Sequence, residues 1–221
     1  MEIMEKLLYL FDAEPAVIEG LCAWLERRPD IKVVAKAESV KDALSIIDSA
    51  CIDETKRIVA VTDLSFRRIG EQKNIDGLRI LKAIADSKKP IKALVFSSLD
   101  MGGYLRTCMS PKYGATGFLS KECNRDTFFE ALDCLYDDKP YFSERLKTVL
   151  DETENIYGKL SKTERIVLKL MLSDLTNHEI AERLDISIRT VENHVSHIYG
   201  KAKAYDRYAL FIKVGGGDID I

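Results

Sequence analysis

The sequence predicts an α/β fold: a five-stranded, parallel, doubly wound sheet, followed by a C-terminal all-α domain of four helices. Two observations support this. Short apolar runs alternate with helical patterns through the first half of the chain, and beyond about residue 159 helical patterns follow one another with only short breaks. With 221 residues, the chain is long enough to build two hydrophobic cores.

The strands and helices are predicted from the period of the apolar residues. Strands are expected where apolar runs are short and continuous, at 6–11, 31–37, 57–62, 91–96 and 116–119. Helices are expected between and after them where apolar residues recur at helical spacing, at 15–28, 40–50, 76–87 and 124–136. Because parallel sheets place ligand and catalytic groups at the carboxyl ends of their strands, functional residues are sought directly after each run.

Charge and turn residues divide the chain into parts. We expect an α/β domain over 1–138, a charged linker with at most one short helix over 139–158, a helical domain over 159–215 and a glycine-rich, frayed tail over 216–221. Within the helical domain the four predicted helices are 162–173, 177–184, 188–200 and 207–214.

Composition excludes several classes of protein. Hydrophobic residues make up 46% and charged residues 31%, as in globular proteins, and no apolar run approaches the roughly 20 residues of a membrane span. The N-terminal stretch contains Glu2, Glu5 and Lys6, which does not fit a secretory signal, so we expect a cytoplasmic protein with no membrane partner. The five cysteines are scattered, without a CxxC pair or a histidine at ligand spacing, which argues against zinc and disulfides.

The net charge of −3 is unevenly distributed. Residues 159–214 contain ten lysines and arginines against seven aspartates and glutamates, which leaves the rest of the chain at −6. The basic part is therefore the helical part, which weakly favours nucleic acid as its partner.

The second and third predicted helices of this part form the stronger functional signal. They are joined by the short turn Asp185-Ile186-Ser187, and Thr176 with Glu179 forms a capping box before the first of them. Ser161 with Glu164 forms another, and Ser187 can cap the third helix. An apolar seam then joins the two helices, made of Ile180, Ala181, Leu184, Ile186 and Val191. This spacing is typical of the helix-turn-helix unit that binds DNA.

The stretch LSKTERIVLKLMLSDLTNHEIAERLDISIRTVENHVSHIYGKAKAYDRYAL resembles the LuxR/NarL-type helix-turn-helix over about 50 residues, in L-S-x-x-E, N-x-E-I-A and I-S-x-R-T-V-x-x-H. The resemblance implies a transcription regulator that binds double-stranded DNA as a homodimer, with the third helix in the major groove. By position, the implied base contacts are Glu192, Asn193 and Ser196. The implied phosphate contacts are Arg189, Thr190, His197 and Lys201.

The chemistry of these side chains is consistent with that role. Asn193 can bond two edge atoms of an adenine, and Glu192 can accept from a cytosine amino group, each pair contributing roughly 1 to 3 kcal/mol of discrimination. An alternative for Glu192 is a solvated helix residue that repels phosphate. Gly200 departs from the pattern, because glycine costs roughly 1 kcal/mol inside a helix, and we expect the helix to end or bend there.

Residues 6–137 resemble the receiver domain of two-component response regulators. The matching pieces are FDAEPAVIEGL, VTD, IDGLRIL, VFSS and GATGFLSKE. The resemblance implies that Asp63 accepts a phosphoryl group from a sensor histidine kinase, that Asp12 and Asp63 hold Mg²⁺, and that Ser97 and Lys121 grip the phosphoryl group. It also implies that Phe118 is the aromatic switch residue. A carboxylate that attacks phosphorus needs a metal and a cation beside it, which agrees with these residue types.

The receiver departs from its family in two places. Ala13 stands where the family has a second acidic residue, so one metal ligand is missing and only Glu14 is near enough in sequence to replace it. The loop after Asp63, LSFRRIGEQKNI, is long and basic through Arg67, Arg68 and Lys73, and a solvated insertion is favoured over a pocket cover or an anion site. We expect weakened Mg²⁺ binding, and two modes of control stay open: phosphorylation of Asp63, or an atypical, phosphate-independent mechanism.

Two other classes of function compete with a DNA-binding regulator. A small Mg²⁺-dependent phosphatase or phosphotransferase would use Asp63 as its nucleophile, but Ser65 stands where a second catalytic acid is needed, and the chain has no P-loop or GxGxxG. The prediction is therefore that the chain is not an enzyme. A protein-interaction module, in which the C-terminal helices bind another regulator, is the third class.

Overall fold

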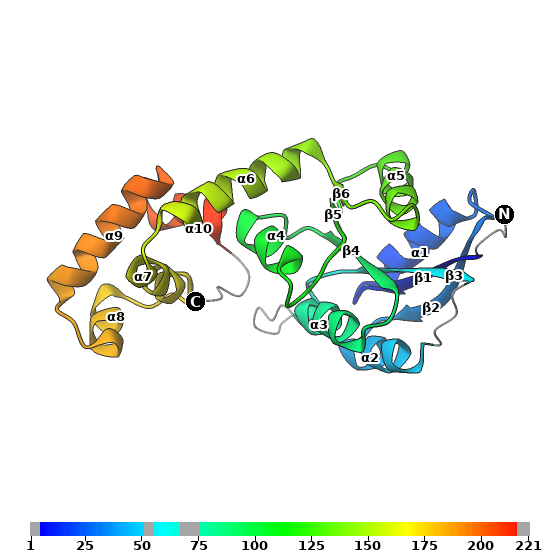
Figure 1. Ribbon diagram of the computed structural model, residues 1–221, viewed down its shortest axis with the longest axis horizontal. Helices are drawn as coiled ribbons and strands as arrows, with labels where there is room; N and C mark the ends of the chain where they lie inside the picture. The colour runs from blue at the N-terminus through cyan, green and yellow to red at the C-terminus, as the bar shows by residue number, and fades with distance from the viewer. Residues whose placement is uncertain (1–4, 51–54, 67–75, 216–221) are drawn as a thin grey trace. The chain divides into compact units, whose positions relative to one another are not determined.

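The computed structural model describes residues 5–50, 55–66 and 76–215. Its contacts divide the chain into two compact units (Figure 1). The first unit comprises Met1–Asp100 with Cys108–Ser143, and the second comprises Met101–Thr107 with Glu144–Ile221. Each unit is described by itself below.

The first unit is built on a parallel sheet of six strands in the order β2-β1-β3-β4-β5-β6. The strands are β1 (Glu5–Phe11), β2 (Ile31–Ala37), β3 (Lys56–Thr62), β4 (Ile91–Ser97), β5 (Gly117–Ser120) and β6 (Tyr141–Phe142). Alternate residues of β1, β3 and β4 belong to opposite faces, and the last five residues of each strand are all buried, as expected for a sheet covered on both sides.

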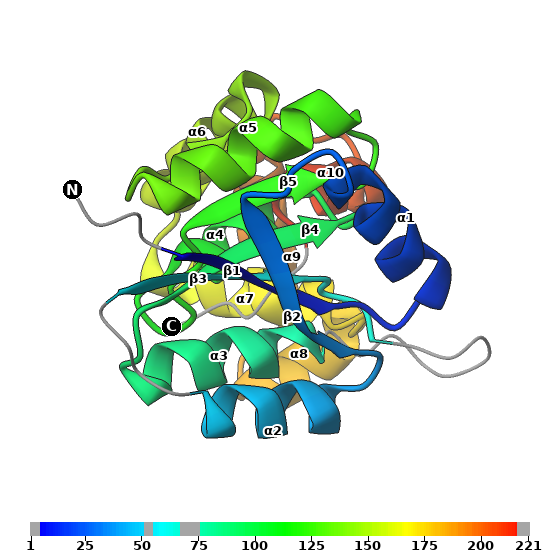
Figure 2. The ribbon, with the colours of Figure 1, turned by 90° about the vertical axis from the view of Figure 1, so that its right-hand side faces the viewer.

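Helices cover both faces of this sheet. In Figures 1 and 2, α1 (Pro15–Leu25) and α5 (Arg125–Tyr136) lie on one face, and α2 (Val40–Ser49) and α3 (Gly77–Ser87) lie on the other. Ile18 and Leu21 of α1 and Phe128 of α5 pack against the strands in one continuous core. The expected doubly wound arrangement is confirmed.

The sheet and its helices differ from the prediction in two respects. The sheet has a sixth strand, because Tyr141 and Phe142, placed in the linker by the sequence, pair with Gly117 and Phe118. The helix α4 (Gly102–Met109) was not predicted, since it begins with two glycines, which are poor helix formers. The other predicted elements are present with ends shifted by a few residues.

The second unit is helical. Besides the start of α4 it contains α6 (Glu144–Lys159), α7 (Lys162–Leu172), α8 (Asn177–Leu184), α9 (Ile188–Ala202) and α10 (Arg207–Val214). Its core draws fully buried residues from α7, α8, α9 and α10, including Val167, Ile180, Val191, Ile198 and Leu210. The helix α6 occupies most of the predicted linker, because Leu146, Thr153, Ile156 and Tyr157 give this polar segment one buried face.

Several predictions concern residues outside the described part of the chain. These are the basic loop with Arg67, Arg68 and Lys73, the tail 216–221 and Cys51.

The other four cysteines, Cys22, Cys108, Cys123 and Cys134, are free thiols. Within the described ranges, no helix combines the length and apolar character needed to cross a membrane.

Candidate functional site

Four of the predicted receiver residues lie at the carboxyl edge of the sheet. Asp12 follows β1, Asp63 follows β3, Ser97 ends β4 and Lys121 follows β5. Asp12 and Asp63 are each 4% exposed and Ser97 is fully buried, so charged groups are held here out of water. A buried charge is costly without a partner, which makes the contacts of these groups decisive.

Lys121 brings the two carboxylates together. Its Nζ lies 2.8 Å from Asp12 Oδ2 and 2.9 Å from Asp63 Oδ2. The remaining oxygens accept backbone hydrogen bonds: Glu14 N donates to Asp12 Oδ1 at 2.9 Å, and Leu64 N donates to Asp63 Oδ1 at 2.7 Å. All four carboxylate oxygens therefore have a partner. We call Asp12, Asp63 and Lys121 the carboxylate–lysine cluster.

Backbone contacts fix the positions of these side chains. Asp63 N donates to Phe11 O at 3.0 Å, and Lys121 N donates to Ser97 O at 3.1 Å, so the strand ends are tied to one another. Gly77 allows α3 to begin directly against the loop after β3, since a Cβ at this position would lie 2.1 Å from Asp63 O. Gly77 belongs to the quoted IDGLRIL motif, but its closeness to Asp63 was not predicted.

Burial and the neighbouring charges shift the pKa values of the cluster residues in opposite directions. Burial raises the pKa of Asp12, and the hydrogen bonds from Lys121 and the Glu14 backbone offset this only in part. Burial by itself would lower the pKa of Lys121, but the adjacent Asp63 and Asp12 carboxylates outweigh it and raise the pKa. Lys121 is thus held as an ammonium ion between the two carboxylates.

The cluster brings together Asp12 and Asp63, the two metal ligands implied by the family resemblance, without a third carboxylate beside them. Ala13 offers no ligand, and Glu14 is exposed at the N-cap of α1, where its side chain makes no capping hydrogen bond. Across the described ranges, no three histidine, cysteine, aspartate or glutamate side chains are grouped closely enough to hold a metal ion. Mg²⁺ prefers several oxygen ligands in octahedral geometry, so two carboxylates already bound to an ammonium fit it poorly.

Ser97 is tied to the cluster through its carbonyl, which accepts from Lys121 N, whereas Phe118 lies within β5. Ser97 Oγ accepts from Leu99 N at 3.2 Å, and no hydrogen bond between described residues joins it to Asp63. Phe118 is fully buried in β5 and is paired with Val95 of β4. Their proposed parts in a switch stay predictions.

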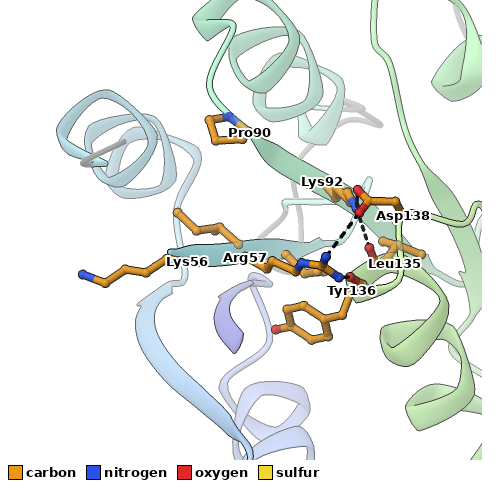
Figure 3. Close-up of a pocket in the computed structure, with 9 residues that line it drawn as sticks. Lys56, Arg57, Pro90, Lys92, Leu135, Tyr136 and Asp138 are labelled. Carbon is orange, nitrogen blue, oxygen red and sulfur yellow. Dashed lines mark hydrogen bonds and ion pairs between the residues drawn. The ribbon is translucent and has the colours of Figure 1, made fainter. Parts of the chain in front are cut away.

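A separate pocket of about 270 Å³ lies where β3 and β4 begin (Figure 3). Lys92 Nζ donates to Leu135 O at 2.7 Å, and Arg57 donates to Tyr136 O, so both cations hold the last carbonyls of α5. Asp138 forms ion pairs with both side chains. Lys92 and Arg57 therefore cap the C-terminal end of α5, which accounts for the positive charges in this pocket.

The helix-turn-helix is formed by α8, a short turn and α9 (Figure 1). Both predicted capping boxes are present, at Ser161 with Glu164 and at Thr176 with Glu179. Asp185 adopts a left-handed conformation with φ of 53°, which turns the chain, and Ser187 Oγ then accepts from Thr190 N at 3.1 Å. The start of α9 is therefore fixed by local hydrogen bonds.

The helix α9 has two distinct faces. Val191, Ile198 and Ala202 are buried against the rest of the unit. The other side, here called the α9 exposed face, carries the exposed residues Arg189, Glu192, Asn193, Ser196, His197 and Gly200. Five of the seven predicted DNA contacts belong to this face, and Thr190 is half-buried next to it.

The sequence predicted that α9 ends or bends at Gly200, and the predicted end is wrong. The helix continues to Ala202 and is closed by Lys203, which adopts a left-handed conformation with φ of 50°. A Cβ on Gly200 would meet no atom within 4 Å. The packing of Val191, Ile198 and Ala202 maintains the helix through this position, since tertiary contacts override a propensity cost of about 1 kcal/mol.

Lys201 has a partner inside the unit. Its Nζ lies 2.8 Å from Glu164 Oε1 and 2.6 Å from Glu164 Oε2, and Glu164 is only 3% exposed. Glu164 Oε2 also accepts from Ser161 N at 2.6 Å, as part of the capping box. The sequence revealed the capping role of Glu164, but not that the same carboxylate binds α9. A phosphate contact by Lys201 stays a prediction.

The two units define a protein with an input domain of receiver type and an output domain of helix-turn-helix type. The family model for the response regulator receiver domain matches residues 8–133, and that for bacterial regulatory proteins of the luxR family matches residues 158–214. The chain belongs to the response regulators, with a LuxR-type DNA-binding domain at its C-terminal end.

Two proteins named as response regulators are similar to this chain over most of its length. The nitrate/nitrite response regulator protein NarL of Escherichia coli K12 is 28% identical over 208 residues, covering 90% of either chain. The response regulator protein VraR of Staphylococcus saprophyticus is 25% identical over 206 residues, covering 91% of this chain and 92% of VraR.

Solved structures share the fold. RcsB from Salmonella enterica serovar Typhimurium, bound to a promoter in the presence of a phosphomimetic, matches with a TM-score of 0.72 at 21% identity, covering 96% of this chain and 98% of RcsB. A structure of two RcsB dimers bound to two parallel DNAs matches with a TM-score of 0.69 at 21% identity, covering 93% of this chain and 96% of RcsB.

Proposed function

We propose that this chain regulates transcription in the cytoplasm by binding specific double-stranded DNA sites as a homodimer, and that it acts as a regulator and not as an enzyme. The observation that carries the proposal is the α9 exposed face: a rigid helix that is anchored on one side and presents polar and charged side chains on the other. An α-helix of this kind fits the major groove of B-DNA.

The side chains of the α9 exposed face divide into two groups by chemistry. Ser196 lies one turn after the adjacent residues Glu192 and Asn193, and all three side chains are short enough to bond base edges. Arg189, Thr190 and His197 flank them and supply donors for phosphate oxygens. Sequence discrimination would therefore come from the first group and general affinity from the second.

Lys201 supports the proposed DNA interface indirectly, by its bond to Glu164. Its ammonium is neutralised by a buried carboxylate 2.6 Å away, so it adds little net charge for a phosphate. A phosphate contact would require Lys201 to be shared between Glu164 and the DNA. Its proposed part is therefore to hold the C-terminal end of α9 in place.

A dimer is supported by the solved structures that share this fold, which include RcsB dimers on DNA. Two copies of α9 would enter successive major grooves, about 34 Å apart, at a pseudo-palindromic site. The first unit would control this binding, either through phosphorylation of Asp63 by a sensor histidine kinase, with Ser97 and Phe118 as the switch, or without phosphate.

Salt dependence tests whether the interface contacts phosphates. Because each phosphate contact releases counterions, the slope of log affinity against log salt should become about one unit less steep per protomer in Arg189→Ala. Arg27→Ala removes the same charge from an exposed position in the first unit and serves as the control, with an unchanged slope. The measurement is a mobility shift with genomic fragments at several salt concentrations, and a slope near zero for the wild type would rule out DNA as the partner.

A further inference from the structure

The carboxylate–lysine cluster contains its own cation, the Lys121 ammonium. Each of its four carboxylate oxygens already has a donor: two backbone amides at 2.7 and 2.9 Å, and the Lys121 ammonium at 2.8 and 2.9 Å. The side chain of Lys121 is 14% exposed and those of Asp12 and Asp63 are each 5% exposed, so the contacts are largely shielded from solvent. Charge pairs in such surroundings are screened less than those on the surface.

A metal bridging Asp12 and Asp63 would have to share their oxygens with this ammonium and with two backbone amides. The Oδ2 atoms of both residues are bound to Lys121, and the Oδ1 atoms are bound to the backbone. Ala13 offers no oxygen in exchange, and the Glu14 carboxylate is exposed. Mg²⁺ loses its tightly held waters reluctantly, so a site with two occupied carboxylates offers it little compensation.

We infer that Lys121 is the resident counter-ion of Asp12 and Asp63, that the cluster does not take up Mg²⁺ at millimolar concentrations, and that the first unit is therefore of the atypical, phosphate-independent type. The inference rests on the proposed function only for its consequence, which is that DNA binding is controlled without a phosphoryl group. The cluster itself holds the carboxyl ends of β1, β3 and β5 together.

The chain contains its own reporter for this site. Trp24 is the single tryptophan, and it lines a cavity of about 190 Å³ together with Lys121, Val17, Leu21 and Phe96. Its fluorescence should therefore respond when the charges or contacts of Lys121 change. The readout involves no DNA, so its failure and the failure of the DNA-binding proposal are distinguishable.

The test is a Mg²⁺ titration of the full chain at constant ionic strength, followed by Trp24 fluorescence. The wild type should show no saturable change up to millimolar Mg²⁺. Ala13→Asp restores a carboxylate next to Asp12 and should gain a saturable response, whereas Ala23→Asp adds the same charge at an exposed position further along α1 and should not. Saturation of the wild type below millimolar Mg²⁺, or an Ala13→Asp chain that does not respond, would overturn the inference.

Removal of the counter-ion gives a second test. Lys121→Met leaves two buried carboxylates without their shared partner and should lower the Tm of the first unit by about 5 °C or more. Added Mg²⁺ should then recover part of this loss in Lys121→Met and leave the wild-type Tm unchanged. An unchanged Tm in Lys121→Met would show that Lys121 is not the counter-ion of this cluster.

Discussion

Replacing Glu164 with alanine is expected to lower the free energy of unfolding of the second unit by about 2 to 3 kcal/mol, because it removes one member of a buried ion pair. The loss is placed below the usual range for such pairs because the Lys201 side chain is 35% exposed and water can solvate it. The measurement is urea unfolding of the full chain, followed by far-UV circular dichroism. Trp24 fluorescence monitors the first unit, which should be unaffected.

Glu179→Ala is the matched control. Glu179 occupies the same capping-box position in the first turn of α8, but it is exposed and its hydrogen bonds are with Thr176. Its replacement should cost clearly less than that of Glu164. Equal losses in the two variants would contradict the assignment of Glu164 as the anchor of α9 through Lys201.

The effect of Glu164 should also depend on pH. Burial by itself would raise its pKa, but the hydrogen bonds from Lys201 and the Ser161 backbone outweigh it and lower the pKa to about 2 from an ordinary 4.5. Because the folded-state pKa is lowered, the stabilisation is complete above about pH 4.5 and is lost as the pH falls toward 2. The difference between wild type and Glu164→Ala should therefore shrink over this interval.

Asn193→Ala is expected to weaken binding to a selected DNA site by roughly 5- to 150-fold, which corresponds to 1 to 3 kcal/mol for a lost base contact. Binding to random-sequence DNA should change little, since the substitution removes no charge. Competition assays that compare the two ligands at one salt concentration measure this ratio. The fold should be preserved because Asn193 is exposed on α9.

Asn155→Ala provides the corresponding control for the α9 exposed face. It removes the same side chain from an exposed position on α6 in the same unit, and both affinities should remain at the wild-type level. If Asn193→Ala reduced both affinities equally, Asn193 would support the interface without discriminating between sequences.

Much of the fold could be predicted because local and long-range signals agree. The five longer strands were marked by continuous apolar runs, and the helices α7, α8 and α9 were marked by capping residues that the structure shows in place. β6 was missed because its pairing partner is distant in sequence, and α4 because its first residues are poor helix formers. Tyr141 pairs with Gly117, and the two glycines that open α4 give no helical signal.

The candidate sites were predictable as sets of residues but not as contacts. The strand-end rule brought Asp12, Asp63, Ser97 and Lys121 to one edge, which the structure confirms. The bond from Lys121 to Asp63 spans 58 residues of sequence, and the bond from Lys201 to Glu164 spans 37. Local sequence patterns do not reveal contacts between residues so far apart in the chain. The two lysines were therefore predicted as site residues, but the carboxylates that they bind were not predicted as their partners.

Methylation interference on a DNA site selected by the full chain tests the central claim most directly, because guanine N7 faces the major groove and adenine N3 faces the minor groove. If α9 lies along base edges in two successive major grooves, methylation of guanine N7 should block binding in two patches about 10 base pairs apart. Interference confined to adenine N3, or none at either position, would contradict the account.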